Sequence, residues 1–436
     1  MTTLQACQQL DAQDPLRHLR DQFNLPESII YLDGNSLGAL PKATAARVAQ
    51  VVTQEWGTGL ILSWNTAGWI DQPQHLGDKL ARLVGANPGE VVAADSTSIN
   101  LYKVLSAALA IAAHDAPARK TILSERNNFP TDLYMAEGLC EERGMRLELV
   151  EPDQIAASLN ADVAVLMLTH VNYRSGAMHD MAGVTQAAHQ AGALTVWDLA
   201  HSAGAVPVSL TQADADFAVG CGYKFLNGGP GAAAFLWVNP RHSIRQDINH
   251  GKGVIQPLRG WMGHATPFAF TPGYAPAPGI ARYLCGTPGV LGMAALDCGL
   301  DTLLAAEPLG GMAALYAKSL RLSDLFMALV EQNCAGHGLG VVTPKAHAQR
   351  GSQVSLTCES APAYAIMQAL IARGVIGDFR AGDAHSGGHN KDLLRFGFTP
   401  LYTGFAEVWQ AVDQLRQVLE KGEWKQPQFN QKLAVT

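Results

Sequence analysis

The stretch VWDLAHSAGAVPVSLTQADADFAVGCGYKFLNGGPG, residues 196–231, decides the fold. It is read as a short apolar strand ending at Asp198, a connection, a second apolar strand over residues 216–220, and Lys224 just past that strand. The 26 residues from Asp198 to Lys224 leave room for the crossover of a dozen or more residues that joins neighbouring parallel strands. Both side chains are therefore expected outside the strand ends, where open α/β sheets bind ligands.

Asp198 and Lys224 supply one carboxylate and one amine. Pyridoxal phosphate requires this pair: an amine that condenses with its aldehyde, and a carboxylate that keeps its ring nitrogen protonated. The sequence NGGPG that closely follows Lys224 predicts a turn with exposed backbone N–H groups, which is an unusual setting for a surface lysine. Taken singly, each residue has an ordinary alternative, a solvated lysine and a helix cap after a strand.

The same residues carry a family resemblance. DLAHSAGAVPVSL and GCGYKFLNGGPG resemble the fold-type I pyridoxal-phosphate enzymes of the class V aminotransferase group and, within that group, the kynureninase family. YLDGNSLGALP (31–41), NNFPTDLY (127–134) and LRFGFTPLYTGF (394–405) match the same family in order. The resemblance implies an α/β fold in which a mostly parallel, seven-stranded sheet forms a large domain beside a smaller α+β domain.

Composition restricts the partners and the compartment. The chain has 436 residues and a net charge of −7, without runs of Lys or Arg, so nucleic acid and anionic membranes are not expected as partners. Its seven cysteines lack C-x-x-C spacing and the first residues lack a signal segment, which predicts a reduced, cytoplasmic protein. The longest apolar run, residues 104–113, is too short to span a bilayer and predicts a buried helix.

Three regions are expected along the chain. Residues 1–65 form an arm that contributes to the small domain and the active site, residues 66–290 the large cofactor-binding domain, and residues 291–436 the C-terminal small domain. A helix is expected over 7–23 in the arm, and a single strand over 375–379 in the small domain. Two polar tracts, 239–260 and 381–392, look longer than the family requires and are predicted to be loops; the two histidines of the second tract indicate no metal site.

A phosphate site is expected where a strand is followed by an apolar helix. Thr97 and Ser98 stand at the start of that helix, and a helix N-terminus favours an anion. The alternative for an isolated Ser/Thr pair is a plain helix cap. Phe129 and Asp132 lie at another helix start, and Thr169 ends an apolar strand. The resemblance implies that Phe129 stacks on the pyridine ring with Asp132 beside it, whereas Asp132 alone would be read as a helix cap.

The resemblance implies the remaining site residues. His201 is placed at the phosphate or ring-hydroxyl side of the cofactor, although a lone histidine is more often a satisfied buried one. Tyr223 is a candidate for proton transfer and phosphate contact, Trp261 for a phosphate contact, and Thr287 for the substrate side of the cofactor. Arg395 is a charge in an apolar strand pattern, which is costly unless paired, and its planar fork fits a substrate carboxylate.

The resemblance implies hydrolytic cleavage of L-kynurenine, and of 3-hydroxykynurenine, to an anthranilate and L-alanine, in tryptophan catabolism or pyridine nucleotide biosynthesis. A homodimer with a shared active site is expected, with Trp261 reaching the cofactor of the other subunit. The alternatives are another class V enzyme, such as a cysteine desulfurase or an aminotransferase, and a non-catalytic cofactor-binding protein. A nicotinamide-dependent oxidoreductase is excluded because no G-x-G-x-x-G follows a strand.

Overall fold

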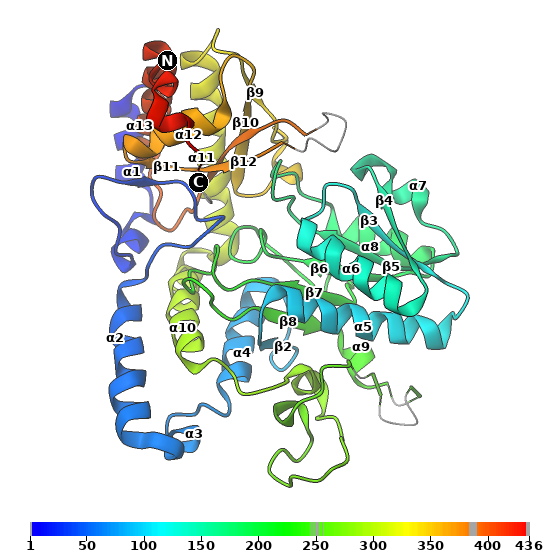
Figure 1. Cartoon of the computed structure of the whole chain (residues 1–436). Coiled ribbons are helices and arrows are strands. Elements are labelled where there is room, and N and C mark those ends of the chain that lie inside the picture. The colour runs from blue at the N-terminus through cyan, green and yellow to red at the C-terminus, as the bar shows by residue number, and fades with distance from the viewer. Residues whose placement is uncertain (1, 246, 249–252, 255, 383–389, 433–436) are drawn as a thin grey trace.

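In the computed structural model of the chain, a seven-stranded sheet forms the centre of the larger part of the molecule (Figure 1). The strand order is β2-β8-β7-β6-β5-β3-β4, and β8 runs antiparallel to both of its neighbours while the pairs from β7 to β4 are parallel. The predicted mostly parallel, seven-stranded α/β fold is therefore confirmed. The strands are β2 (Val91–Ala93), β3 (Thr121–Glu125), β4 (Arg146–Val150), β5 (Val163–Thr169), β6 (Leu194–Asp198), β7 (Phe217–Gly220) and β8 (Phe235–Val238).

The structure describes residues 2–245, 247–248, 253–254, 256–382 and 390–432. Parts of both predicted polar loops, residues 246, 249–252, 255 and 383–389, lie outside this range. The described part of the first tract contains a short helix, α9 (Pro240–Ser243). No helix in the described ranges combines the length and the apolar character needed to cross a bilayer.

Both faces of the large sheet are covered, which explains why its strands are continuous apolar runs. In β8, Phe235 and Trp237 face one buried cluster, whereas Leu236 and Val238 face another. Helices α5 and α6 cover the second face, and α4, α8 and α10 contribute to the first cluster. The helices of this part are α4 (Gln72–Val84), α5 (Thr97–Asp115), α6 (Pro130–Arg143), α7 (Ile155–Ser158), α8 (Met181–Gln190) and α10 (Val290–Leu304).

A second, smaller sheet lies above the first in Figure 1 and is antiparallel, in the order β12-β13-β10-β9. The predicted single strand over 375–379 is wrong: β11 pairs in parallel with β1, and β12 joins the small sheet. The two strands separate at Gly377. The elements are β1 (Ile30–Tyr31), β9 (Leu339–Val341), β10 (Gln353–Cys358), β11 (Val375–Ile376), β12 (Asp378–Arg380), β13 (Leu393–Gly397), α11 (Gly311–Asn333), α12 (Ala363–Ala372) and α13 (Phe405–Lys421).

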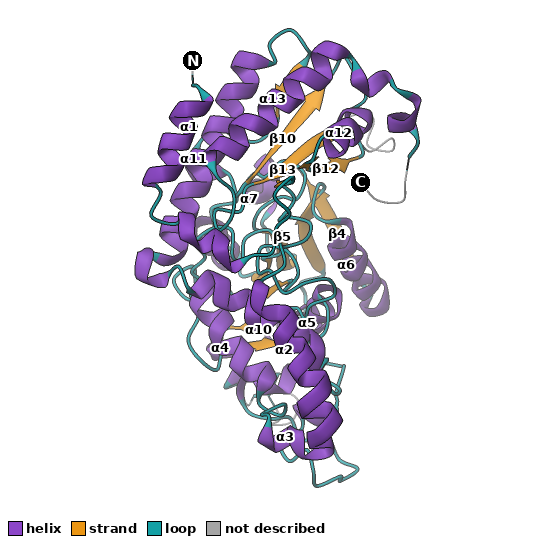
Figure 2. Cartoon of the chain, turned by 90° about the vertical axis from the view of Figure 1, so that its left-hand side faces the viewer, coloured by secondary structure: helices purple, strands orange, loops and turns teal. Residues whose placement is uncertain are grey.

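The first residues pack on the last helices. Helix α1 (Leu4–Gln13) lies against α13, and the chain then runs down the side of the molecule through α2 (Lys42–Gln50) and α3 (Ser63–Thr66), as Figures 1 and 2 show. The predicted continuous helix over 7–23 is wrong, because α1 ends before Asp14 and a 3-10 turn, Arg17–Gln22, follows. Pro15 has no N–H to continue the helical hydrogen bonds. The boundaries at residues 65 and 290 stay predictions.

Candidate active site

Three neighbouring parallel strands bring the candidate residues to one edge of the large sheet. Thr169 and Asp198 are directly opposite each other at the ends of β5 and β6, and Lys224 follows the end of β7. The apolar strands fix these ends because their side chains are buried on both faces. One cavity is lined by Thr97, Ser98, Phe129, Thr131, Asp132, Thr169, Tyr173, Asp198, Ala200, His201, Cys221, Tyr223 and Lys224.

Lys224 is a buried lysine whose amine points into this cavity. Lys224 is 9% exposed, and its Nζ lies 3.0 Å from His201 Nε2. Burial and the charge of Lys224 hold the pKa of His201 well below its usual range, so His201 is neutral. A neutral imidazole accepts a hydrogen bond from the lysine amine. His201 Nδ1 is buried, and the side chain of Gln353 is close enough to raise the pKa of His201 in part.

Two buried carboxyl groups lie together on the other side of the cavity. Burial raises the pKa of both Asp132 and Asp198, and the charge of Asp198 raises that of Asp132 further. The backbone N–H of Ala200 donates to Asp198 Oδ1 at 2.7 Å, and Lys224 lowers the pKa of Asp198. Asp198 is therefore the group that is more readily ionised. Asp132 keeps its proton and donates it in a hydrogen bond to Asp198. Asp132 is not the N-cap of α6, which is Phe129.

The phosphate candidates stand at the start of a long helix. Helix α5 begins at Thr97, and Ser96 caps it by accepting a hydrogen bond from the N–H of Ile99. The side chains of Thr97 and Ser98 both line the cavity. First-turn N–H groups and two hydroxyls at a 19-residue helix favour an anion at this end of the cavity.

Aromatic rings close the cavity. Lys224 Nζ lies 5.7 Å from the ring centroids of both Phe129 and Tyr223. Tyr173 contacts Phe129 edge to face, with centroids 5.3 Å apart. Burial raises the pKa of Tyr223 well above its usual value, so its hydroxyl keeps its proton at neutral pH. Tyr173 was not predicted, although its place four residues past the end of the Thr169 strand was a signal.

Arg395 lies next to this cavity, in β13, an inner strand of the small sheet. It is 1% exposed, and its Nη1 donates to the backbone oxygen of Tyr173 at 2.7 Å. Its Nη2 contacts Asp378 and donates to Ser36 Oγ at 2.8 Å. The charge of Arg395 also lowers the pKa of His201, which places it within electrostatic reach of the cavity. Ser36 belongs to the 31–41 turn, where Gly38 N–H donates to Tyr223 O at 2.8 Å.

Two predicted residues lie outside the cavity in this chain. Trp261 packs edge to face on Trp64 with centroids 5.6 Å apart and lines a separate hollow with Phe270. Thr287 lines another hollow beside Asp95. The remaining predicted cofactor residues lie together around Lys224.

The cavity residues fit pyridoxal phosphate. They include a buried amine, a carboxylate beside a proton-holding carboxyl group, an aromatic face and a helix N-terminus with two hydroxyls.

Comparison with known proteins decides the family. A family model described as the kynureninase C-terminal domain matches residues 315–415. Kynureninases of Pseudomonas fluorescens and Burkholderia pseudomallei are each 54% identical to the chain over 439 residues, covering 100% of both sequences. The chain belongs to the kynureninase family.

Solved structures with the same fold carry other names. A cysteine desulfurase of Thermococcus onnurineus matches with a TM-score of 0.75 and 18% identity, covering 92% of this chain and 98% of that one. One from Escherichia coli matches with a TM-score of 0.73 and 19% identity, covering 94% and 98%. At this identity the likeness shows the fold alone, which the kynureninase family shares with these enzymes.

A larger cavity formed by the described residues lies elsewhere. It has a volume of about 1320 Å³ and is lined by Glu125, His170, Arg174 and His179, among others, but by none of the residues around Lys224. The segment after β5 separates the two, because Thr169 and Tyr173 face the lysine whereas His170 and Arg174 face this cavity. The catalytic residues expected of a kynureninase therefore gather in the smaller cavity.

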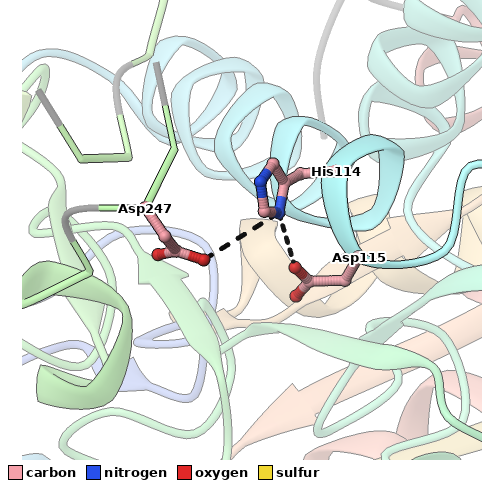
Figure 3. A group of neighbouring side chains, drawn as sticks. All are labelled: His114, Asp115 and Asp247. Carbon is pink, nitrogen blue, oxygen red and sulfur yellow. Dashed lines mark hydrogen bonds and ion pairs between the residues drawn. The ribbon is translucent and has the colours of Figure 1, made fainter. Parts of the chain in front are cut away.

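One group of potential metal ligands stands out within the described ranges, on the surface (Figure 3). It consists of His114, Asp115 and Asp247. The guanidinium of Arg245 already donates to Asp115 at 2.6 Å and contacts Asp247. A positive charge therefore balances both carboxylates, and the group is explained as an ion-pair network.

Sequence reasoning missed the charged residues around Arg395. Asp378 lies opposite Arg395 on the neighbouring strand, and Arg380 follows on the same face two residues later. Asp33 belongs to the 31–41 turn, and burial raises its pKa to about 7. The alternation Asp-Phe-Arg was the available signal, but which strand it pairs with is not visible locally.

Proposed function

We propose that the protein uses pyridoxal phosphate to hydrolyse the Cβ–Cγ bond of L-kynurenine, and of 3-hydroxykynurenine, giving anthranilate or 3-hydroxyanthranilate and L-alanine. The observation that carries the proposal is the Lys224 amine, buried with Asp198 at the ends of neighbouring parallel strands in a chain 54% identical over its whole length to kynureninases.

When bound, pyridoxal phosphate supplies an aldehyde that condenses with amines and a ring that accepts electrons from adjacent bonds. Asp198 would keep its ring nitrogen protonated, and Thr97 and Ser98 would hold its phosphate at the start of α5. Phe129, Asp132 and Thr169 would hold its ring. Neutral His201 lies 3.0 Å from the Lys224 amine and orients it.

Lys224 would hold the cofactor through its amine, and this amine would be free when an amino-acid substrate is bound. The free amine then removes the α-proton of the substrate as a general base and returns a proton later. Tyr223, whose hydroxyl stays protonated at neutral pH because burial raises its pKa, serves as the nearby proton donor. Arg395 binds the α-carboxylate. Trp261, which lies outside the cavity of its own chain, contacts the phosphate in the site of the other subunit.

The desulfurase alternative requires a thiolate over the cofactor. Cys221 is the cysteine that lines the cavity, and burial raises its pKa, so it stays a thiol. Its Sγ contacts the backbone oxygen of Ala200, and it lies one residue past the end of β7 rather than on a long loop. A non-catalytic carrier is disfavoured because it needs no buried arginine beside the cavity.

We also propose a homodimer located in the cytoplasm, without nucleic-acid or membrane partners. The net charge of −7 supports the absence of polyanionic partners. All seven cysteines are free thiols in the described structure, which is typical of a reducing compartment. Exposed aromatic residues around Trp261, including Phe268 and Phe270, support a subunit contact there.

A direct assay tests the activity. Purified protein supplied with the cofactor is mixed with L-kynurenine, and anthranilate is followed by its fluorescence while L-alanine is quantified separately. We expect equimolar anthranilate and alanine, and none with Lys224→Met. Release of sulfur from cysteine without any anthranilate would favour the desulfurase alternative instead.

A further inference from the structure

Two arginines share one buried carboxylate beside the active site. Arg395 Nη2 and Arg380 Nε both contact Oδ2 of Asp378, the latter at 2.7 Å. The side chains of Arg395 and Asp378 are 1% and 4% exposed, whereas that of Arg380 is 35% exposed. Asp378 and Arg395 are directly opposite each other across β12 and β13, so the sheet places their side chains within reach of each other.

The donors of Arg395 are committed in a way that blocks two-point binding of a second carboxylate. A carboxylate binds two neighbouring guanidinium nitrogens, and both edges that offer such a pair include Nη2. Nη2 has two N–H groups, and these serve Ser36 and Asp378. Nε is buried and has no partner in the described structure. A substrate carboxylate that uses Nε and Nη2 must therefore take the place of Asp378.

Such an exchange is costly unless Asp378 keeps a partner, because removing one member of a buried ion pair leaves an uncompensated charge. Arg380 already contacts the same oxygen and is more exposed, so it can retain Asp378. Burial and the charge of Asp378 raise the pKa of nearby Asp33 to about 7, which favours the neutral form of this carboxyl group. A further carboxylate beside Arg395 and Arg380 is therefore favoured.

We propose that Arg380 is a positioning residue that takes over Asp378 when the substrate α-carboxylate binds Arg395. The inference rests on the proposed function, since it requires an amino-acid substrate. Arg380 acts through Asp378 and lowers the free-energy cost of the exchange of carboxylates on Arg395. The side chain of Arg380 is 35% exposed, which leaves it more room to move with Asp378 than Arg395 has between Tyr173 and Ser36.

The exchange predicts opposite effects of the two substitutions. Arg380→Gln leaves Asp378 on Arg395 and weakens carboxylate binding by about tenfold, within the range of couplings in charge networks. Asp378→Asn removes the competing carboxylate, so carboxylate binding stays as strong or becomes stronger. In the double variant the effect of Arg380→Gln disappears. Arg380→Lys restores part of the affinity, because it keeps the charge without the planar fork.

The experiment titrates the holoenzyme with L-alanine and with ethylamine, which lacks the carboxylate, and follows the cofactor absorbance. Arg380→Gln is expected to lower the affinity for alanine about tenfold and to leave the affinity for ethylamine unchanged. In kynurenine turnover it raises KM with little change in kcat. Arg373→Gln is the matched control, because Arg373 pairs with Glu423 in the same domain at 2.6 Å. Circular dichroism and the cofactor spectrum check that each variant is folded and loaded.

The exchange is overturned if Asp378→Asn weakens alanine as much as Arg380→Gln does, since Asp378 would then only support Arg395. It is also overturned if Arg380→Gln lowers the affinity for ethylamine as much as the affinity for alanine. If the wild type cleaves kynurenine but all variants bind alanine with the same affinity, the exchange is wrong and the proposed reaction stands. The predicted variant pattern in a protein that leaves kynurenine intact supports the exchange and counts against the proposed reaction.

Discussion

His170 is a buried histidine beside the candidate active site, and its protonation makes the stability of the fold depend on pH. It follows Thr169 directly, faces the large cavity and packs edge to face on Trp197. Burial lowers its pKa from 6.5 to about 4. Because the unfolded chain takes up this proton at higher pH than the folded one, the folded state loses stability as pH falls from about 6.5 to about 4.

The test compares melting temperatures of wild type and His170→Gln between pH 7 and pH 4. A single group changes the free energy of unfolding by at most about 1.4 kcal/mol per pH unit. As pH falls, we expect the free energy of unfolding of the wild type to decrease relative to that of the variant. The decrease is at most about 1.4 kcal/mol for each pH unit. His75→Gln is the surface control for the loss of a histidine, because the side chain of His75 is 60% exposed. Parallel curves for His170→Gln and wild type would show that His170 does not resist protonation.

At the scale of elements, the stretch 31–41 contacts the loop after β7 that carries Lys224. The contact at Gly38 is too close to admit a methyl group. A Cβ on Gly38 would lie 2.4 Å from the backbone oxygen of Lys224 and 2.6 Å from Asn227 Cα. Gly38→Ala is therefore expected to displace the lysine loop, destabilise the protein by roughly 1–3 kcal/mol and reduce activity. Gly138→Ala is the control, because no described atom lies within 4 Å and the position is inside α6. It should stabilise the protein by about 0.5–1 kcal/mol. Equal melting temperatures and turnover for Gly38→Ala and wild type would contradict this contact.

The elements that carry Thr169, Asp198 and Lys224 were predictable because each follows an apolar run bounded by turn residues. The start of α5 at Thr97 was predictable for the same reason. Pairing across distant parts of the chain was not: β11 and β12 were read as one strand, although they join different sheets. The roles of Asp378 and Arg380 depend on that pairing, so local sequence patterns did not reveal them.

At the scale of the whole molecule, Trp261 lies outside its own cavity, as a residue serving the other subunit would. Inactive Lys224→Ala and Trp261→Ala proteins are mixed under conditions that exchange subunits. If Trp261 acts across the interface, each heterodimer has one complete site and activity should reach about half that of wild type per heterodimer, assuming independent sites. Mixing Lys224→Ala with Asp198→Ala is the control, since both residues line the same cavity and no complete site forms. Heterodimers no more active than the Trp261→Ala parent would rule out the shared site.

The most direct test of the central claim is the location of the covalent bond between protein and cofactor. Borohydride reduces the bond between a lysine amine and the cofactor aldehyde, and peptide mapping then identifies the modified lysine. Lys103 and Lys318 are internal controls, because they are also buried but are paired with Asp95 and Asp14. We expect a yellow protein in which the label lies on the peptide containing Lys224. A label on another lysine, or a protein that takes up no cofactor, would contradict the account.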